Sequence, residues 1–152
     1  MDHPRNLSSR GSTDQATVGQ LVRQACLWEA TAPKPGNVHP GAAFADTCYE
    51  DFILSAEAIL PAMEAASSLG VGQAVFQAVT ATRSMVTSNT NLGLILLLAP
   101  LAAVPRHEPL RPGVRQVLDT LSPEDSEHVY AAIRLAQPGG LGNADNQDVR
   151  YD

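Results

Sequence analysis

Several things are scarce in this chain of 152 residues, and each scarcity narrows the classes of protein it can belong to. Aromatic residues make up 5% of a chain that is 44% hydrophobic, and alanine, leucine and valine supply most of the apolar content, which favours helices over sheets. Basic residues number 10 against 16 acidic ones, and the net charge of −6 disfavours general nucleic-acid binding. The two cysteines, Cys26 and Cys48, lack metal-ligand spacing and indicate a reduced, cytoplasmic protein.

Long apolar runs are also missing. The longest, Leu92 to Val104, contains Gly93 and Pro100 and falls short of the roughly 20 residues that a membrane span needs, so we expect no membrane segment. Residues 1–13 are polar and lack the apolar stretch of a secretory signal, which predicts a disordered leader. We expect a single domain over residues 14–152.

Helical periodicity predicts an all-α, multi-helix bundle. The first helix is expected over residues 14–30, with Leu21 and Trp28 in its buried stripe, and the second from a capping box of Thr47 and Glu50 to Gly70, with a kink at Pro61. A third helix over 72–86 precedes an apolar helix over 92–104, expected to be buried on all sides at the centre of the bundle. Residues 109–113 are expected as a turn, followed by a short fifth helix and by a sixth that begins at Ser122 and Pro123.

The stretch from Ala32 to Gly41 is the most informative segment. Three prolines and two glycines give it one stiff, non-helical path, which can hold Lys34, Asn37 and His39 at fixed positions over the helices. Such a loop suits an anionic, phosphate-bearing ligand, although a rigid connection without chemistry explains the composition equally well. Glu29, a carboxylate placed unfavourably at a helix C-terminus, is expected to have a partner, either Lys34 or a metal ion.

Two further polar clusters lie at helix starts. Asp46 and Asp51 flank the second helix start, and the run from Ser88 to Asn91 precedes the apolar helix. Helix N-termini attract anions, and carboxylates nearby could hold Mg²⁺, which often bridges to substrate phosphates. Ordinary helix capping is the competing interpretation of each cluster. A glycine- and amide-rich loop over 139–148 comes close to the end of the sequence, which suggests a domain that is incomplete at its C-terminus.

These clusters together resemble one known family. The segments Glu29…Pro33-Lys34-Pro35-Gly36-Asn37, then Asp46-Thr47…Asp51, then Ser88-Asn89-Thr90-Asn91-Leu92-Gly93 are similar in order and spacing to the triphosphoribosyl-dephospho-CoA synthase family. The resemblance implies an all-α enzyme that joins ATP to 3′-dephospho-CoA with release of adenine, in the biosynthesis of an acyl-carrier prosthetic group. It implies these roles: Asp46, Asp51 and His39 as catalytic residues; Lys34, Gly36, Asn37, Asn89, Thr90 and Asn91 as nucleotide-binding residues; and Glu29, Asp46 and Asp51 as ligands of Mg²⁺.

The chain departs from the family pattern in three segments. Asn37 and His39 stand where other members carry a leucine and an aspartate. Ala43 stands where other members carry a histidine, and Leu92 stands where they carry a lysine. A related ribosyl or phosphoribosyl transfer in the biosynthesis of a C1-carrier cofactor is therefore an alternative, and a non-enzymatic helical binding module is another. Convergence of Lys34, Asp46, Asp51 and Asn89 on one pocket would favour an enzyme. An exposed apolar face is expected to permit self-association.

Overall fold

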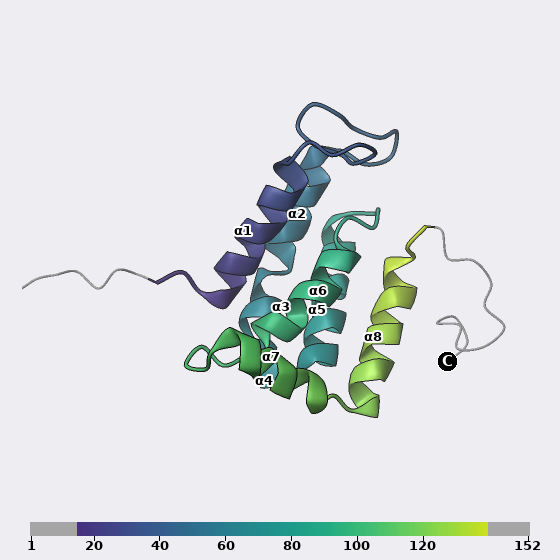
Figure 1. Cartoon of the computed structure of the whole chain (residues 1–152). Helices are drawn as coiled ribbons and strands as arrows, with labels where there is room; N and C mark the ends of the chain where they lie inside the picture. Colours follow the sequence, from purple (N-terminus) through teal and green to yellow (C-terminus); the bar gives the residue numbers. More distant parts are fainter. Residues whose placement is uncertain (1–14, 140–152) are drawn as a thin grey trace, which may run out of the picture.

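The computed structural model describes residues 15–139, and within that range it contains eight helices and no strand. This confirms the predicted all-α bundle. Figure 1 shows α1 and α2 side by side, α7 across one end of the bundle and α8 beside α5. The helices are α1 (Val18–Thr31), α2 (Tyr49–Ala58), α3 (Leu60–Glu64), α4 (Ala66–Leu69), α5 (Val71–Met85), α6 (Leu92–Ala102), α7 (Leu110–Asp119) and α8 (Pro123–Ala136).

Local sequence signals set several of the helix ends. Ser122 caps α8 in a box with Asp125, with proline at the first helical position, as predicted. Pro61 falls just after the break between α2 and α3, since proline has no N–H to continue the ladder. Gly70 separates α4 from α5 with a φ of 83°, a conformation that favours glycine.

Two predicted boundaries were wrong. The cap of α2 is Cys48 and not Thr47, and the side chain that reaches back to it is Asp51 and not Glu50. The Asp51 carboxylate accepts the Cys48 N–H at 2.8 Å, so the box lies one residue further along the chain. Residues 110–113, expected in a turn, form the first turn of α7, because Pro109 is compatible with a helix start and Gly113 packs on Val104.

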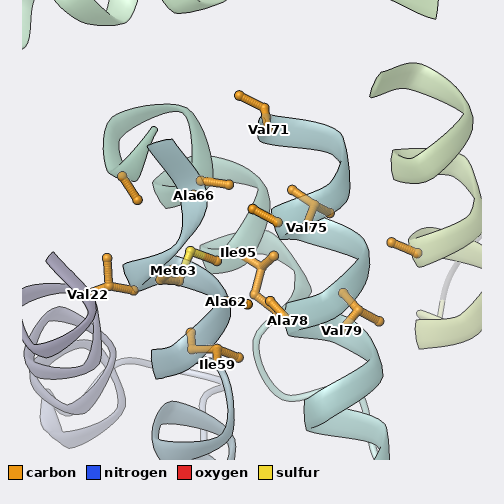
Figure 2. Close-up of a cluster of buried hydrophobic side chains, with 14 of the residues drawn as sticks. Val22, Ile59, Ala62, Met63, Ala66, Val71, Val75, Ala78, Val79 and Ile95 are labelled. Carbon is orange, nitrogen blue, oxygen red and sulfur yellow. The ribbon is translucent and has the colours of Figure 1, made fainter. Parts of the chain in front are cut away.

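The core lies where α6 meets α1, α3, α4, α5 and α7. This confirms the prediction that the apolar helix lies at the centre of the bundle. Figure 2 shows Met63 and Ile95 near the middle of the buried cluster, with Ile59 and Val75 beside them. All four side chains are fully buried. Alanines from α2 to α6 and from α8 fill the remaining space, which suits closely packed helices.

The predicted burial of α1 and α6 needs correction. The buried stripe of α1 consists of Gly19, Val22, Cys26 and Ala30, whereas Leu21 and Trp28 are 50% and 70% exposed. The α6 helix is not buried on all sides, because Leu97 is 65% exposed. None of the other described helices covers that side of α6. None of the helices in residues 15–139 is long and apolar enough to cross a membrane.

Candidate active site

The loop between α1 and α2 follows a closely defined path beyond the ends of both helices (Figure 1). Asn37 donates its N–H to the Lys34 carbonyl at 3.2 Å, and Gly36, between them, has a φ of 77°. His39 and Ala42 then exchange two backbone hydrogen bonds of 3.0 and 2.9 Å across a narrow turn. The stiff path expected from the prolines and glycines thus consists of two successive hydrogen-bonded turns.

Lys34 folds back onto the end of α1. Its ammonium group donates to the Glu29 carbonyl at 2.8 Å and forms an ion pair with the Glu29 carboxylate. The lysine thereby satisfies a free carbonyl of the helix C-terminus and neutralises a charge that the helix dipole disfavours. Of the two partners expected for Glu29, the structure supplies Lys34. Both side chains remain about one-third exposed, so a ligand can reach them.

The loop before α6 is fixed by a buried polar network. The hydroxyl groups of Ser55 and Thr90 lie 2.6 Å apart, and Asn91 donates to the Ser55 carbonyl at 3.4 Å. Thr82 donates to the Asn91 amide oxygen at 3.2 Å. Since Ser55, Thr82 and Asn91 are buried, these bonds tie the start of α6 to α2 and α5.

Sequence reasoning missed Ser55 and Thr82. A signal was present, because each is a polar residue on an otherwise apolar helical stripe: Ser55 lies between Phe52 and Ile59, and Thr82 follows Val79. Buried polar side chains of this kind need hydrogen-bond partners. Their presence on these stripes therefore indicates that side-chain hydrogen bonds hold the neighbouring loop in place.

The two loops border a cavity of about 440 Å³ that is open to solvent and is here called the loop cavity. It joins segments far apart in the sequence: the end of α1, the loop after it, the start of α2 and the first turn of α6. Its lining residues are Glu29, Gly36, Asn37, Val38, Phe44, Phe52, Thr90, Asn91, Gly93, Leu94 and Leu97.

Five of the predicted site residues line this cavity, namely Glu29, Gly36, Asn37, Thr90 and Asn91, and Lys34 is bonded to one of them. The convergence expected of Lys34, Asp46, Asp51 and Asn89 is not seen, because none of them lines the cavity and only Lys34 is bonded to a residue that does. Asp46, Asp51, Asn89 and His39 all lie outside its lining.

Each of these four residues has a local interaction instead. Asp51 accepts the Cys48 N–H, and Asn89 accepts the Leu92 N–H at 3.3 Å. Asp46 accepts a long bond of 3.4 Å from the Thr47 hydroxyl, and the His39 ring accepts the Gly41 N–H at 3.2 Å. Asp46 and Asp51 are nevertheless close to the lining residues Phe44 and Phe52 in the chain.

The expected metal ligands do not form a cluster. Among residues 15–139, no group of three or more histidine, cysteine, aspartate or glutamate side chains is placed to hold a metal ion. Glu29 alone of the three predicted ligands lines the loop cavity, together with amide and hydroxyl oxygens from Asn37, Thr90 and Asn91. A hard cation there would need further oxygen ligands from a bound molecule.

A second cavity, of about 310 Å³, lies toward the other end of the α1 and α6 pair and is here called the apolar cavity. Most of its lining is aliphatic. Two charged residues, Arg106 and Glu108, line it from the segment before α7. It is lined by Val18, Leu21, Val22, Ala25, Leu98, Leu101, Ala102, Val104, Pro105, Arg106, Glu108 and Leu110.

The structure defines an all-α protein with a cavity of mixed polar and apolar lining at its helix ends. Residues 15–152 match the family model for CitG, ATP:dephospho-CoA triphosphoribosyl transferase, and the chain belongs to that family. The family assignment makes it a transferase with ATP and dephospho-CoA as substrates. No curated protein and no solved structure matches the chain significantly.

Proposed function

We propose that the loop cavity binds ATP and that its triphosphate lies against the first turn of α6. An α-helix leaves its first N–H groups without intrahelical acceptors, and its dipole favours an anion there. Gly93 occupies that turn and lines the cavity, and no heavy atom lies within 4 Å of the position a Cβ would take. The observation that carries the proposal is that the first turn of α6 and Glu29, the ion-pair partner of Lys34, line one cavity.

Lys34 supplies the positive charge in this proposal. It is held at the end of α1 by Glu29, and its exposed part can turn to a phosphate as a point charge. Because Leu92 replaces the lysine that other family members carry before their glycine, Lys34 has a larger share of the phosphate charge to balance.

We further propose that ATP binds with Mg²⁺. The cavity offers a carboxylate from Glu29 and neutral oxygens from Asn37 and Thr90, a donor set that suits this hard cation. Magnesium typically takes one or two protein carboxylates and completes its shell with phosphate oxygens and water. Bound there, the ion would neutralise part of the triphosphate charge. Asp46 and Asp51 stay predictions as further ligands.

The reaction is a displacement at the anomeric carbon of the ATP ribose. The bond from that carbon to adenine breaks, a ribose hydroxyl oxygen of dephospho-CoA bonds to it, the hydroxyl proton passes to a base, and adenine leaves with a proton. The chain contributes by holding the triphosphate still, since positioning lowers the entropic part of the barrier. Asp46, Asp51 and His39 remain the predicted candidates for the base.

The family assignment favours this enzyme over a non-enzymatic binding module, while transfer in C1-carrier cofactor biosynthesis remains an alternative acceptor chemistry. A cytoplasmic location, consistent with both substrates, stays a prediction. Self-association through the exposed side of α6 also stays a prediction. All but the first residue of the predicted loop over 139–148 lies outside the described residues.

Calorimetric titration of the full chain with ATP in Mg²⁺ tests the proposal. Lys34→Ala should weaken ATP binding about tenfold to 150-fold, the range for a hydrogen bond to a charged group of about 1.5–3 kcal/mol. Arg106→Ala, which removes a cation from the apolar cavity, is the matched control and should leave ATP affinity unchanged. Chelation of Mg²⁺ with EDTA should weaken binding as well. Equal ATP affinity in wild type and Lys34→Ala would sink the proposal.

A further inference from the structure

Aromatic rings are concentrated at the loop cavity. The chain has three phenylalanines, and two of them, Phe44 and Phe52, line this one cavity. Phe52 is half-buried on α2, but Phe44 is 55% exposed and comes from the loop. In a chain with so few aromatic residues, core packing alone does not explain why two rings lie in the wall of one cavity.

The Phe44 ring is placed by its backbone. Its N–H donates to the Thr47 carbonyl at 2.9 Å, which closes the turn that leads into α2. The buried core is complete without this side chain, because none of the core residues is drawn from the 39–54 segment. Phe44 therefore exposes a large apolar ring at a fixed position, a costly arrangement unless a ligand covers the ring.

The lining of the cavity divides into two chemical kinds. Amide, hydroxyl and carboxylate groups come with the helix ends, whereas Phe44, Phe52, Leu94 and Leu97 supply apolar surface. Leu97 is the most exposed leucine of the described chain, at 65%. A molecule that fits both kinds of wall carries a polyanionic part next to a flat, weakly polar ring, which is the constitution of a purine nucleotide.

We propose that Phe44 is an adenine-stacking residue of this cavity, with Leu97 covering part of the same base. The inference rests on the proposed function and deepens it, because it separates base recognition from phosphate binding. Both substrates of the family carry adenine, so the shared chemistry is the purine face. Stacking on an aromatic side chain needs only the π-face of the base, and it is worth a measurable part of the affinity.

The test compares four ligands on Phe44→Ala and wild type, with the full chain in Mg²⁺. ATP and inorganic tripolyphosphate differ by the nucleoside, and dephospho-CoA and 4′-phosphopantetheine differ by the adenosine nucleotide. Phe44→Ala should weaken ATP or dephospho-CoA binding about fivefold to 150-fold, the range of base–aromatic stacking. Binding of the ligand without adenine should be unchanged.

Two further variants keep the result interpretable. Phe44→Trp retains a π-face and should keep the adenine-dependent affinity. Leu118→Ala removes a similarly exposed apolar side chain, 48% against 55%, from α7, away from the loop cavity, and should have no effect. Circular dichroism should show unchanged helix content in each variant, since Phe44 lies outside the core.

The outcomes separate the two proposals. Loss confined to ATP assigns the stack to the leaving base, and loss confined to dephospho-CoA assigns it to the acceptor. Unchanged affinity of Phe44→Ala for both adenine ligands overturns the inference, even if Lys34→Ala still weakens tripolyphosphate and the phosphate site stands. A wild-type chain that binds tripolyphosphate no more weakly than ATP and dephospho-CoA also contradicts an adenine subsite.

Discussion

The α5–α8 contact and the α1–α6 contact differ in the size of the residues that form them. Gly72 of α5 donates its N–H to the Asp125 carboxylate at 2.8 Å, and a Cβ on Gly72 would lie 2.5 Å from the Asp125 Cα. On α8 the buried residues are Ala132 and Ala136. Small residues let the two backbones approach until almost no space remains between them.

The α1–α6 contact is the open counterpart. Large side chains such as Leu21 and Leu97 project from it without cover, and cavities lie along it. The cavity at the α1 N-terminal end is largely apolar, whereas the one at its C-terminal end also has polar groups in its lining, which two loops and the helix ends supply. The comparison teaches that helix packing decides where space is left, and that the loops decide what chemistry the space has.

The largest effect should appear on α6 itself, which has one side in the core and one in the open. Ile95→Ala removes a fully buried side chain and should lower the free energy of unfolding by about 2–5 kcal/mol. Leu97→Ala, on the exposed side of the same helix, should change it by less than about 0.5 kcal/mol. Urea titrations of both variants measure this, and equal losses would mean that α6 is covered on all sides after all.

Next in size is the closed contact. Gly72→Ala should destabilise the chain by about 1–3 kcal/mol, because the added methyl group meets the Asp125 backbone and the two helices must separate. Thermal unfolding with circular dichroism measures the loss. Ala74→Gly on the same helix is a useful reference. It should cost about 1 kcal/mol through lower helix propensity, together with the loss of one methyl contact, and it adds no atom that could clash. A Gly72→Ala chain as stable as wild type would contradict close approach.

A glycine in the open region should behave in the opposite way. Gly93→Ala meets no atom of the chain, and alanine favours a helix, so stability should be unchanged or raised by up to about 1 kcal/mol. The methyl group would stand where the triphosphate approaches α6, so ATP affinity should fall about fivefold to tenfold, or about 1–1.4 kcal/mol. Calorimetry and a melting curve on one sample separate the two effects. Weaker binding with lost stability would point to misfolding instead.

The smallest effect is a pH dependence at the closed contact. Hydrogen bonds from the Ser122 and Gly72 N–H groups hold the pKa of the Asp125 carboxyl below its usual range. Its contribution to stability is therefore full above the unfolded pKa of about 3.9 and is lost as the pH falls toward the lower folded value. Because Asp125 is partly exposed, we expect less than about 1 kcal/mol.

Urea titrations of wild type and Asp125→Asn at several pH values measure that contribution. The difference between the two should be constant near neutral pH and should shrink below about pH 4. A difference that persists undiminished to the lowest pH would rule out the carboxylate as its source.

Helix starts and breaks were predictable where a residue acts through its own backbone. Ser122 with Pro123, the break near Pro61 and the positive φ of Gly70 follow from local chemistry alone. Cys48 as a cap could not be foreseen, because its thiol is a weak cap and the box depends on where Asp51 can reach. Competition between Thr47 and Cys48 is decided by the Phe44 to Thr47 turn, which uses the Thr47 carbonyl.

The buried face of a helix was less predictable, because it depends on which other helices pack against it. The stripe of α1 that includes Trp28 is more apolar than the stripe through Gly19 and Cys26, yet the latter is buried. Gly19 lies against the Leu60 carbonyl, so close approach to α3 selects that face. Periodicity alone gives the rotation of a helix only when one face is clearly apolar.

The candidate site was predictable in its residue types and only partly in its geometry. Glu29, Asn37 and Thr90 come together as the motif order suggested. Asp51 and Asn89 instead serve the local capping that was the competing interpretation. The aromatic wall with Phe44 could not be read from spacing, because a loop residue has no periodicity to give its direction.

The central claim is that ATP binds in the loop cavity and not in the apolar one. Amide chemical-shift mapping by NMR on the full chain, titrated with ATP in Mg²⁺, tests this most directly. The account predicts the largest shifts at the amides of Gly36, Asn37 and Gly93, with those of Leu101 and Leu110 unchanged. Shifts gathered around Leu101 and Leu110, or no localised shifts under saturating ATP, would contradict it.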